Sequence, residues 1–383
     1  MSKIDTVKWK EYEVGELFDI ETCRGFNTDK IILKEIPTDV SCYEFIGRTR
    51  KNYGLQGYVK NLGVPFNNKG TITISQVGTI TAQYRKEDYY ASQNMFKLTL
   101  KEDNKTSKHK LFLVSVLDKK LVKYTGYSHY PTLQSIKIEK IKLPTKNNQP
   151  DWEYMENYIT EIENKYINKL EQHNNEKIEQ ALKVTGLSKE DLKEDLKVEP
   201  AKRYEKFRVG DLFNVTACKG IDAGKIRIQE KQTNANQVEF IGRTKTNNGL
   251  QGYVEILSFS PNEQNTITIS QIGTITAQYR KNKYYTSQNM FKIKYKSKEL
   301  TEKQNLYYTA VLDKMLIKYT GYTNYPTVKN LVEEIITLPA IDENTPDFEY
   351  MEKAIYIYFR QVIQNWKLSS EKEIEELKQV INK

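Results

Sequence analysis

Polar side chains of the kind that bind nucleic acid recur beside glycine turns at two places in this 383-residue chain. Arginine and lysine groups hold phosphates, and planar amide or guanidinium groups hydrogen bond with base edges. For any single residue of this kind, a turn-stabilising hydrogen bond is the simpler interpretation. Taken together in a basic chain, they favour DNA binding. The candidate DNA-binding residues are Arg48, Lys51, Asn52, Gln76, Gln83, Tyr84, Arg85, Gln93, Asn94 and Tyr127 in the first half, and Arg243, Lys245, Asn247, Gln271, Gln278, Tyr279, Arg280, Gln288, Asn289 and Tyr322 in the second.

Catalytic and metal-binding motifs are not found in the sequence. The three cysteines and three histidines are far apart and lack ligand spacing, which argues against a zinc or di-iron site. Neither a phosphate-binding glycine loop nor a methyltransferase motif occurs. Pro150-Asp151 with Glu153 resembles a nuclease motif, but Met155 replaces its lysine, so a helix-capping carboxylate is favoured. We expect a protein that binds and positions, with no catalytic residue, metal or cofactor of its own.

The net charge of +9 is divided unevenly along the chain. Residues 1–149 hold 25 Lys and Arg against 16 Asp and Glu, and residues 200–345 hold 21 against 14. Residues 150–199 hold 7 against 13, and residues 346–383 hold 6 against 7. Two basic segments therefore alternate with acidic ones, which indicates two sites for a polyanion joined by parts that avoid it. Lysine-rich solvated surfaces are the alternative explanation.

The elements that must position these residues belong to an internal repeat. Residues 71–85 recur at 266–280 with one change in fifteen, Val77 to Ile272, and residues 46–59 recur at 241–254 with the same offset of 195. Alternating Thr and Ile broken by glycines predicts short strands and hairpins in each copy. A helix follows, with an apolar face predicted at Leu111, Val114, Leu117, Leu121 and Val122.

A long Glu/Lys-rich helix ends each copy. Its predicted apolar stripe runs through Met155, Ile159, Ile162, Tyr166 and Leu170 in the first copy, and through Met351, Ile355, Tyr358, Val362 and Trp366 in the second. Such stripes pack against another helix, so we expect the two long helices to pair. The predicted fold class is α+β: two duplicated β-rich domains separated by two long, antiparallel paired helices, with the repeats related by a pseudo-twofold axis. The expected boundaries are 1–149 for the first domain, 150–183 for its long helix, 184–202 for a connector, 203–345 for the second domain and 346–383 for the second long helix.

With this organisation, the chain resembles the specificity (S) subunits of bacterial Type I and related Type IIB-like restriction-modification systems over essentially its whole length. The motifs that carry the resemblance are Trp9-Lys10-Glu11-Tyr12 with Val14-Gly15-Glu16-Leu17-Phe18, Phe207 with Val209-Gly210-Asp211-Leu212-Phe213, the Ile-Gly-Arg-Thr…Asn-x-Gly-Leu-Gln-Gly-Tyr-Val blocks, the Ile-Thr-Ile-Ser-Gln-x-Gly-Thr strands and the Leu-Pro pairs at 143 and 338. Many members then open the helix with Pro-x-x-Glu-Gln-x-x-Ile. Here Asp-Trp/Phe-Glu-Tyr-Met-Glu stands instead, which looks like the Type IIB-like and fused Type IIG branches.

The resemblance implies a non-catalytic subunit with two target recognition domains, which places a DNA adenine methyltransferase, and with it a nuclease, on a bipartite double-stranded DNA sequence. S-adenosylmethionine would then be bound by the methyltransferase partner. Because the two domains carry nearly the same side chains, we expect a palindromic or nearly palindromic target with both halves methylated. A helix of about 33 residues spans roughly 50 Å. Allowing for tilt, we expect the half-site centres to lie on the order of one turn of DNA, ~10 base pairs, apart. Differences between the repeats at 28–41 and 60–70 could still alter one base.

Two alternatives stay open from the sequence. One is an autonomous DNA-binding regulator or inhibitor with the same duplicated fold, and the other is a glycan- or peptide-binding module, which 27 tyrosines would also suit. DNA binding would weaken steeply with salt, whereas glycan or peptide binding would not. No membrane segment or signal-peptide core is found, so we expect a cytoplasmic protein without membrane contact.

Overall fold

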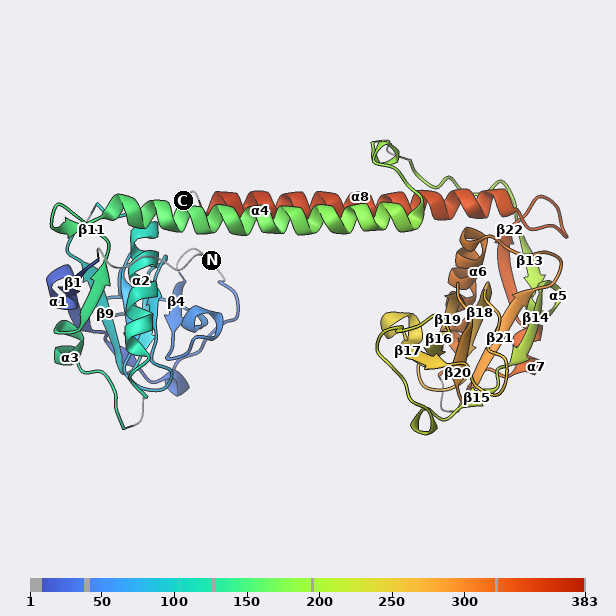
Figure 1. The fold of residues 1–383 in the computed structure, drawn as a ribbon, viewed down its shortest axis with the longest axis horizontal. Helices are drawn as coiled ribbons and strands as arrows, with labels where there is room; N and C mark the ends of the chain where they lie inside the picture. The colour runs from blue at the N-terminus through green and yellow to red at the C-terminus, as the bar shows by residue number, and fades with distance from the viewer. Residues whose placement is uncertain are drawn as a thin grey trace. The chain divides into compact units, whose positions relative to one another are not determined.

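The computed structural model of the chain describes residues 9–37, 42–102, 104–125, 128–193, 196–320 and 323–381. The chain divides into two compact units, Met1–Gln172 with Glu376–Lys383, and His173–Glu375. Each unit contains one globular part of strands and short helices (Figure 1), which we call the first and the second globular part. Together with the long helices, these parts confirm the α+β fold class predicted from the repeat.

The first globular part is built from short strands joined by turns. Its helices are α1 (Val14–Leu17), α2 (Ser107–Leu121) and α3 (Leu133–Lys137). Its strands are β1 (Lys10–Glu13), β2 (Phe18–Thr22), β3 (Gly25–Phe26), β4 (Tyr43–Ile46), β5 (Leu55–Val59), β6 (Ile72–Ser75), β7 (Ala82–Tyr84), β8 (Tyr89–Ser92), β9 (Met95–Leu100), β10 (Lys140–Leu143), β11 (Thr145–Lys146) and β12 (Gln149–Pro150).

The antiparallel sheet β2-β9-β6-β7 carries the main core of this part. Successive side chains of a strand point to opposite faces, so Ile72 and Ile74 enter the core while Thr73 points to the other face. Helix α2 packs against β7 and closes this core. Its buried face includes Phe112, Leu113, Leu117 and Leu121, whereas the predicted Leu111 and Val114 are half-buried and Val122 is exposed.

A second sheet has the order β3-β8-β4-β5. Its central strand β8 pairs in parallel with β3 and with β4, and β4 pairs antiparallel with β5. Residues 47–54 connect β4 to β5, so this loop leaves the sheet beside the hairpin β6–β7 of the first sheet.

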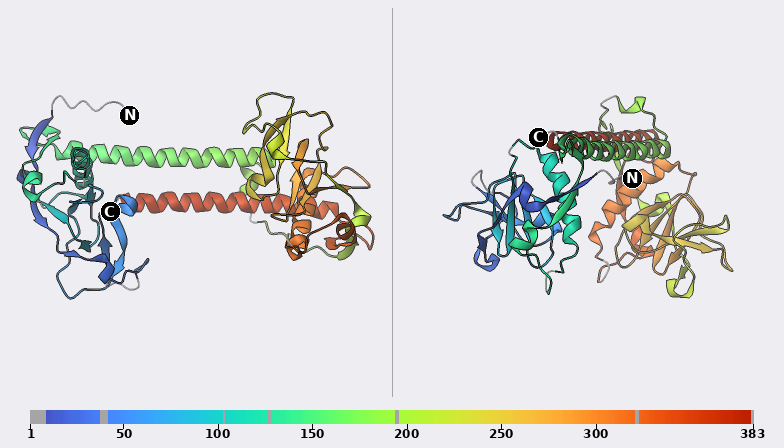
Figure 2. Two further views of the ribbon diagram at one scale, coloured as in Figure 1. Left: turned by 90° about the horizontal axis from the view of Figure 1, so that it is seen from below. Right: turned by 60° about the vertical axis from the view of Figure 1, so that its left-hand side comes forward.

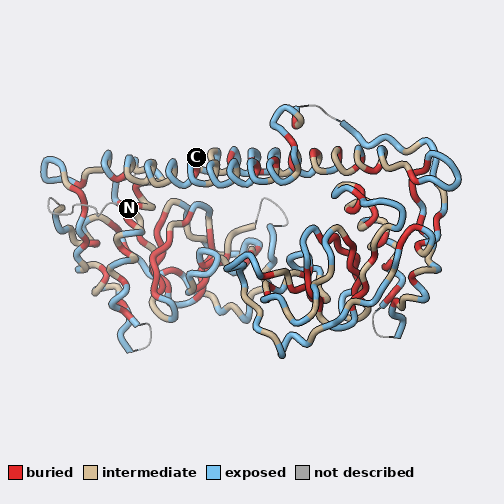
Figure 3. Tube along the Cα trace, turned by 45° about the vertical axis from the view of Figure 1, so that its right-hand side comes forward, coloured by how far each residue is buried: buried red, intermediate tan, exposed pale blue. Residues whose placement is uncertain are grey.

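The second globular part repeats this topology, with sheets β14-β21-β18-β19 and β15-β20-β16-β17. Figure 3 shows buried residues concentrated in the interior of each globular part. The helices of the second globular part are α5 (Val209–Leu212), α6 (Glu302–Met315) and α7 (Val328–Glu333). Its strands are β13 (Tyr204–Arg208), β14 (Phe213–Ala217), β15 (Gly220–Ile221), β16 (Gln237–Ile241), β17 (Leu250–Glu255), β18 (Thr266–Ser270), β19 (Ala277–Arg280), β20 (Tyr284–Ser287), β21 (Met290–Tyr295) and β22 (Ile335–Pro339).

The two long helices are α4 (Trp152–Thr185) and α8 (Phe348–Ile381), each of 34 residues. Both are continuous rods in the views of Figure 2. The Oδ1 atoms of Asp151 and Asp347 accept hydrogen bonds from the backbone N–H groups of Tyr154 and Tyr350, at 3.0 and 2.9 Å. These N-terminal caps confirm that Asp151 is a capping carboxylate.

Within the unit His173–Glu375, the end of α4 packs against α8. Ile178 and Leu182 share a buried cluster with Ile363. Lys177 Nζ lies 6.0 Å from the ring centroid of Trp366, and further along the chain Asp191 Oδ1 accepts a hydrogen bond from Tyr356 Oη at 2.5 Å. Residue numbers rise from 177 to 191 along the end of α4 and the connector, while those of their partners in α8 fall from 366 to 356. The paired segments are therefore antiparallel, as predicted.

The buried stripe of α8 differs from the predicted one. Tyr358 and Val362 are 58% and 47% exposed, and the buried positions are Met351, Ala354, Ile357, Arg360, Ile363, Ser370 and Ile374. Tyr166 of α4 is exposed in the same way, beside the buried Ile167. Apolar residues occupy adjacent positions in both helices, so spacing alone does not decide which neighbour faces inward.

Candidate nucleic-acid interface

A buried arginine holds the loop that joins β4 to β5, which we call the arginine loop (residues 47–54). Arg85 is 3% exposed, and its Nη1 donates to the carbonyl oxygen of Tyr53 at 2.7 Å while its Nε donates to Thr73 Oγ1 at 2.9 Å. Its Nη2 donates to Gln83 Oε1 at 2.5 Å, and Gln83 Nε2 donates to the carbonyl oxygen of Thr49 at 3.0 Å. Two side chains thus fix two carbonyl groups of the loop. Burial lowers the pKa of Arg85 to about 10, so it stays charged at neutral pH.

We call the buried pair Gln83 and Arg85 the clamp. The second globular part contains the same clamp, Gln278 and Arg280, on its own arginine loop (residues 242–249). Arg280, 1% exposed, donates from Nη1 to the carbonyl oxygen of Asn248 at 2.6 Å, from Nε to Thr268 Oγ1 at 2.9 Å and from Nη2 to Gln278 Oε1 at 2.5 Å. Gln278 Nε2 donates to the carbonyl oxygen of Thr244 at 3.0 Å. The four predicted residues Gln83, Arg85, Gln278 and Arg280 therefore lie behind the loops. Direct contact of these side chains with DNA stays a prediction.

Glycine is required where the arginine loop passes the clamp. Gly54 has φ +78°, and a Cβ atom there would lie 2.7 Å from Gln83 Oε1. Gly249 has φ +74° and the same 2.7 Å approach to Gln278 Oε1. Any side chain would push the amide away from its arginine, so these glycines keep the clamp closed.

An aspartate of helix α2, Asp118, joins the arginine loop to the hairpin β6–β7. It was not among the residues predicted from the sequence. Asp118 Oδ1 accepts hydrogen bonds from Thr81 Oγ1 at 2.9 Å and from the backbone N–H of Ala82 at 3.1 Å. The same carboxylate pairs with Arg50 through both terminal nitrogens, at 2.8 and 3.1 Å. Asp313 makes the equivalent bonds, with Lys245 in the place of Arg50. Val-Leu-Asp-Lys recurs at residues 116–119 and 311–314 with the common offset of 195, and this recurrence could have revealed both aspartates.

Two further loops adjoin the arginine loop in each part. The backbone N–H of Gln76, at the tip of the hairpin β6–β7, donates to the carbonyl oxygen of Asn94 at 2.9 Å, and Gln271 donates to Asn289 at the same distance. A Cβ atom at Gly78 would lie 3.3 Å from the carbonyl oxygen of Arg48, so the hairpin tip also touches the arginine loop. The three loops form one rim, at residues 47–54, 75–81 and 92–95.

Most of the predicted residues outside the clamp lie on this rim and its copy. Tyr84 is half-buried, whereas Tyr279 is buried and donates to Asn265 Oδ1 at 2.7 Å, and burial raises its pKa to about 12. Tyr127 and Tyr322 lie outside the described residues. The exposed residues are Arg48, Lys51, Asn52, Gln93, Asn94, Lys245, Asn247, Gln288 and Asn289, and the half-buried ones are Gln76, Arg243 and Gln271.

The rim offers cations and amides, a combination suited to binding a polyanion. In the part of the chain that the structure describes, no three His, Cys, Asp or Glu side chains gather as a metal site. Within the same residues, no helix is long and apolar enough to cross a membrane.

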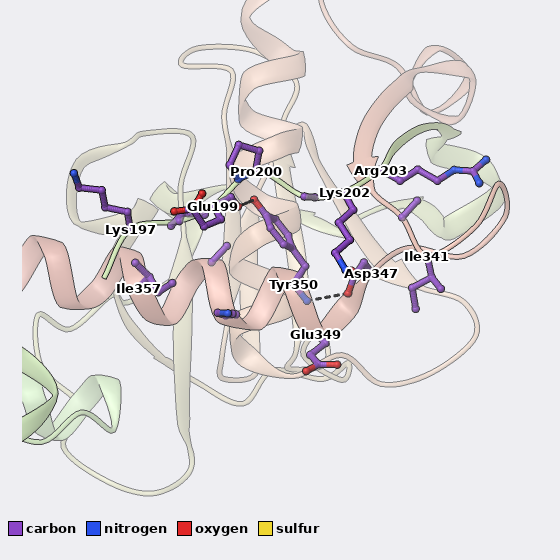
Figure 4. A pocket seen from close by; sticks show the side chains of 15 residues that line it. Lys197, Glu199, Pro200, Lys202, Arg203, Ile341, Asp347, Glu349, Tyr350 and Ile357 are labelled. Carbon is purple, nitrogen blue, oxygen red and sulfur yellow. Dashed lines mark hydrogen bonds between the residues drawn. The ribbon is translucent and has the colours of Figure 1, made fainter. Parts of the chain in front are cut away.

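A pocket of about 600 Å³ lies elsewhere, where residues 197–203 cross the first turns of α8 (Figure 4). Tyr350 stands in it, and its Oη donates to the carbonyl oxygen of Glu199 at 3.0 Å. Burial and the neighbouring Tyr204 raise the pKa of Tyr350, so the phenol is neutral at physiological pH. The contact attaches the connector to α8.

The likeness to known proteins covers both repeats. A family model described as the Type I restriction modification DNA specificity domain matches residues 6–172 and 201–379. The chain belongs to this family. It is accordingly the specificity subunit of a restriction-modification system, and members of the family are DNA-recognition components.

Individual relatives are distant in sequence. The chain is 21% identical, over 91% of its own length and 93% of the relative's, to the specificity subunit S.BcgI of the Type II restriction enzyme BgcI from Heyndrickxia coagulans. A chain from a structure of complex assembly and conformational transition in the type I R-M system aligns with a TM-score of 0.50 at 14% identity, covering 98% of this chain and 95% of that one. A type I S subunit from M. genitalium aligns with a TM-score of 0.44 at 13% identity, covering 100% and 96%. The TM-score of 0.50 supports a common fold and nothing finer.

Proposed function

We propose that this chain is a subunit without catalytic activity that places a DNA adenine methyltransferase, and with it a nuclease, on a bipartite double-stranded DNA sequence. One observation carries the proposal: each globular part presents an arginine loop whose carbonyl groups are fixed by a buried arginine and glutamine. A rigid loop loses little entropy when it binds, so its exposed Arg48, Lys51 and Asn52 are suited to sequence discrimination. S-adenosylmethionine would be bound by the methyltransferase.

The proposed target has two nearly identical halves. The hairpins at 71–85 and 266–280 differ at one position, and the clamps behind the arginine loops have the same bonds. Similar side chains on a similar frame hydrogen bond with the same base edges. If the repeats are related by a pseudo-twofold axis, as their order predicts, the second half-site falls on the opposite strand. The target is then close to palindromic, with both halves methylated and their centres about 10 base pairs apart.

Genome-wide mapping of methylated adenines in cells that carry the system, with and without this chain, tests the proposal. We expect a bipartite motif that disappears with the chain, whose two halves are inverted copies. Two unrelated half-sites would refute the equivalence of the globular parts. Methylation that is unaffected by deleting the chain would instead favour an autonomous regulator or inhibitor.

The absence of catalysis is tested with the purified chain. We expect neither methyl transfer nor cleavage when it is incubated with DNA, S-adenosylmethionine and Mg²⁺, and we expect methyl transfer once the methyltransferase subunit is added. Methyl transfer by a preparation verified free of any partner would refute the proposal.

A further inference from the structure

The two arginine loops have the same backbone conformation but differ at three positions, and at one of them an aromatic side chain corresponds to an asparagine. In residues 46–59 and 241–254, Arg50, Lys51 and Tyr53 of the first repeat correspond to Lys245, Thr246 and Asn248 of the second. Tyr53 has φ 50° and ψ 31°, and Asn248 has φ 50° and ψ 35°. A tyrosine thus occupies the left-handed conformation that an asparagine occupies in the other repeat.

This conformation is unfavourable for tyrosine. Left-handed backbone is tolerated by glycine and asparagine, but it is an outlier for a bulky side chain. In the first loop it is maintained by Arg85, whose Nη1 holds the carbonyl oxygen of Tyr53 at 2.7 Å, as Arg280 holds Asn248 at 2.6 Å. Strain of this kind persists only where the surroundings impose it, and it gathers at functional sites.

The strained tyrosine gains little from packing in the free protein, because it is 81% exposed. Asn248 differs, since its Nδ2 lies 3.4 Å from the carbonyl oxygen of Tyr279, in its own globular part. The neighbours of Tyr53 on the rim include Arg48 and Lys51, both exposed and both of a kind that binds phosphate. An aromatic ring is therefore held out from a cationic loop.

We propose that Tyr53 determines one base of the first half-site by an apolar contact of its ring with the C5-methyl group of a thymine. This methyl group is the apolar feature that the major groove offers, and a short, polar asparagine does not provide the same contact. The two half-sites then differ at the base pair facing residue 53 or 248, and the palindrome is broken there. The inference rests on the proposed function, since it assumes that the arginine loops face DNA.

Selection from a pool of randomised DNA duplexes, using the chain with its methyltransferase subunit, tests this proposal. The wild-type complex should select a thymine at one position of the first half-site that the second half-site lacks. Tyr53→Asn should abolish that preference, with discrimination falling about tenfold, and make the two half-sites identical there. Asn248→Tyr should create the preference in the second half-site, and Tyr53→Phe should keep it in the first, because the ring remains.

Tyr53→Asn is well suited to the test because asparagine already stands on this backbone in the second repeat, so the variant should melt no lower than the wild type. Loss of the thymine preference in Tyr53→Phe, or its persistence in Tyr53→Asn, would overturn the inference while the bipartite motif stands. A wild-type complex that selects no sequence at all would overturn the proposed function and this inference with it.

Discussion

The hairpins at 71–85 and 266–280 share fourteen of fifteen residues, whereas the long helices α4 and α8 share their opening Pro-Asp-aromatic-Glu-Tyr-Met-Glu and then diverge. The hairpins have the same neighbours in both repeats: a clamped loop on one side and the aspartate of a covering helix on the other. The helices do not. In α8, Ile357 and Arg360 are buried, while Glu161 and Asn164 at the corresponding places of α4 are exposed.

Within the unit His173–Glu375, α8 has a further neighbour, the connector that follows α4. Leu187 and Leu192 share the buried cluster of Ile363, and the carbonyl oxygens of Leu192 and Leu196 accept hydrogen bonds from Gln364 and Gln361 of α8. The two repeats thus share their sequence where they share their contacts, and they differ where one copy alone has a further segment to bind.

The buried stripe of α8 should be the most sensitive to substitution. Ile363 is 3% exposed, so Ile363→Asp places an unpaired carboxylate in a buried cluster and should lower the free energy of unfolding by about 4 kcal/mol. Val362→Asp is the matched control, since the adjacent Val362 is 47% exposed and should lose less than about 0.5 kcal/mol. Urea denaturation followed by circular dichroism measures both. Equal losses would show that the buried stripe has been assigned to the wrong residues.

The clamps provide the next largest effect, and here the two repeats should behave alike. Arg85→Met and Arg280→Met each remove three hydrogen bonds and leave a buried glutamine oxygen and a loop carbonyl without donors. Each should cost about 3 kcal/mol, because unsatisfied buried acceptors cost about 1–3 kcal/mol apiece. Arg48→Met, which changes an exposed arginine, is the control and should leave stability nearly unchanged. A clear inequality between the two clamp variants would contradict the structural equivalence of the globular parts.

The ion pairs of the aspartates behind the arginine loops should differ slightly in coupling free energy between the two repeats. Arg50 binds Asp118 through two nitrogens, whereas Lys245 binds Asp313 at a single distance of 3.3 Å. Both pairs are partly exposed, so double-mutant cycles should give about 1 kcal/mol for Arg50–Asp118 and about 0.5 kcal/mol or less for Lys245–Asp313. The cycles combine Asp→Asn with Arg50→Met or Lys245→Met. A stronger coupling for the lysine pair would be evidence against the two-nitrogen geometry.

The smallest effect concerns a charge that differs between the repeats at the end of β5 and β17. Lys60 in the first repeat corresponds to Glu255 in the second. Both are exposed, so substitution should hardly change stability. Lys60→Gln should reduce the magnitude of the negative slope of log K against log salt for DNA binding by about 1 if Lys60 contacts a phosphate. Glu255 accepts from Gln237 Nε2 at 2.8 Å, so Glu255→Gln keeps an acceptor while removing the charge and should not reduce this magnitude. A slope unchanged by Lys60→Gln would place Lys60 away from the DNA.

Sequence patterns predicted the fold well because they are local or repeated. Alternating Thr and Ile at 71–75 predicted a strand, and its isoleucines lie in the core. Asp151 indicated the start of α4, which it caps. The clamp could not be inferred in this way. Arginine and glutamine are normally exposed, and one of the acceptors that satisfy the buried Arg85 is a carbonyl group 32 residues away. The exposed members of the candidate site, such as Arg48 and Asn94, were recognisable because turns keep their polar residues at the surface.

The duplicated hairpin also bears on how the chain folds. Strand β6 pairs with β9 through Ile72–Leu98 and Ile74–Phe96, and β18 pairs with β21 through Ile267–Ile293 and Ile269–Phe291. Because these strand pairings are nearly interchangeable, a chain refolding from denaturant can join β6 to β21. This traps a swapped species, a known failure of tandem repeats. Synthesis from the N-terminus avoids this, since only 19 residues (76–94) separate β6 from β9 and the first sheet can close before β18 emerges. The order of translation thus supplies the pairing information that two near-identical hairpins lack.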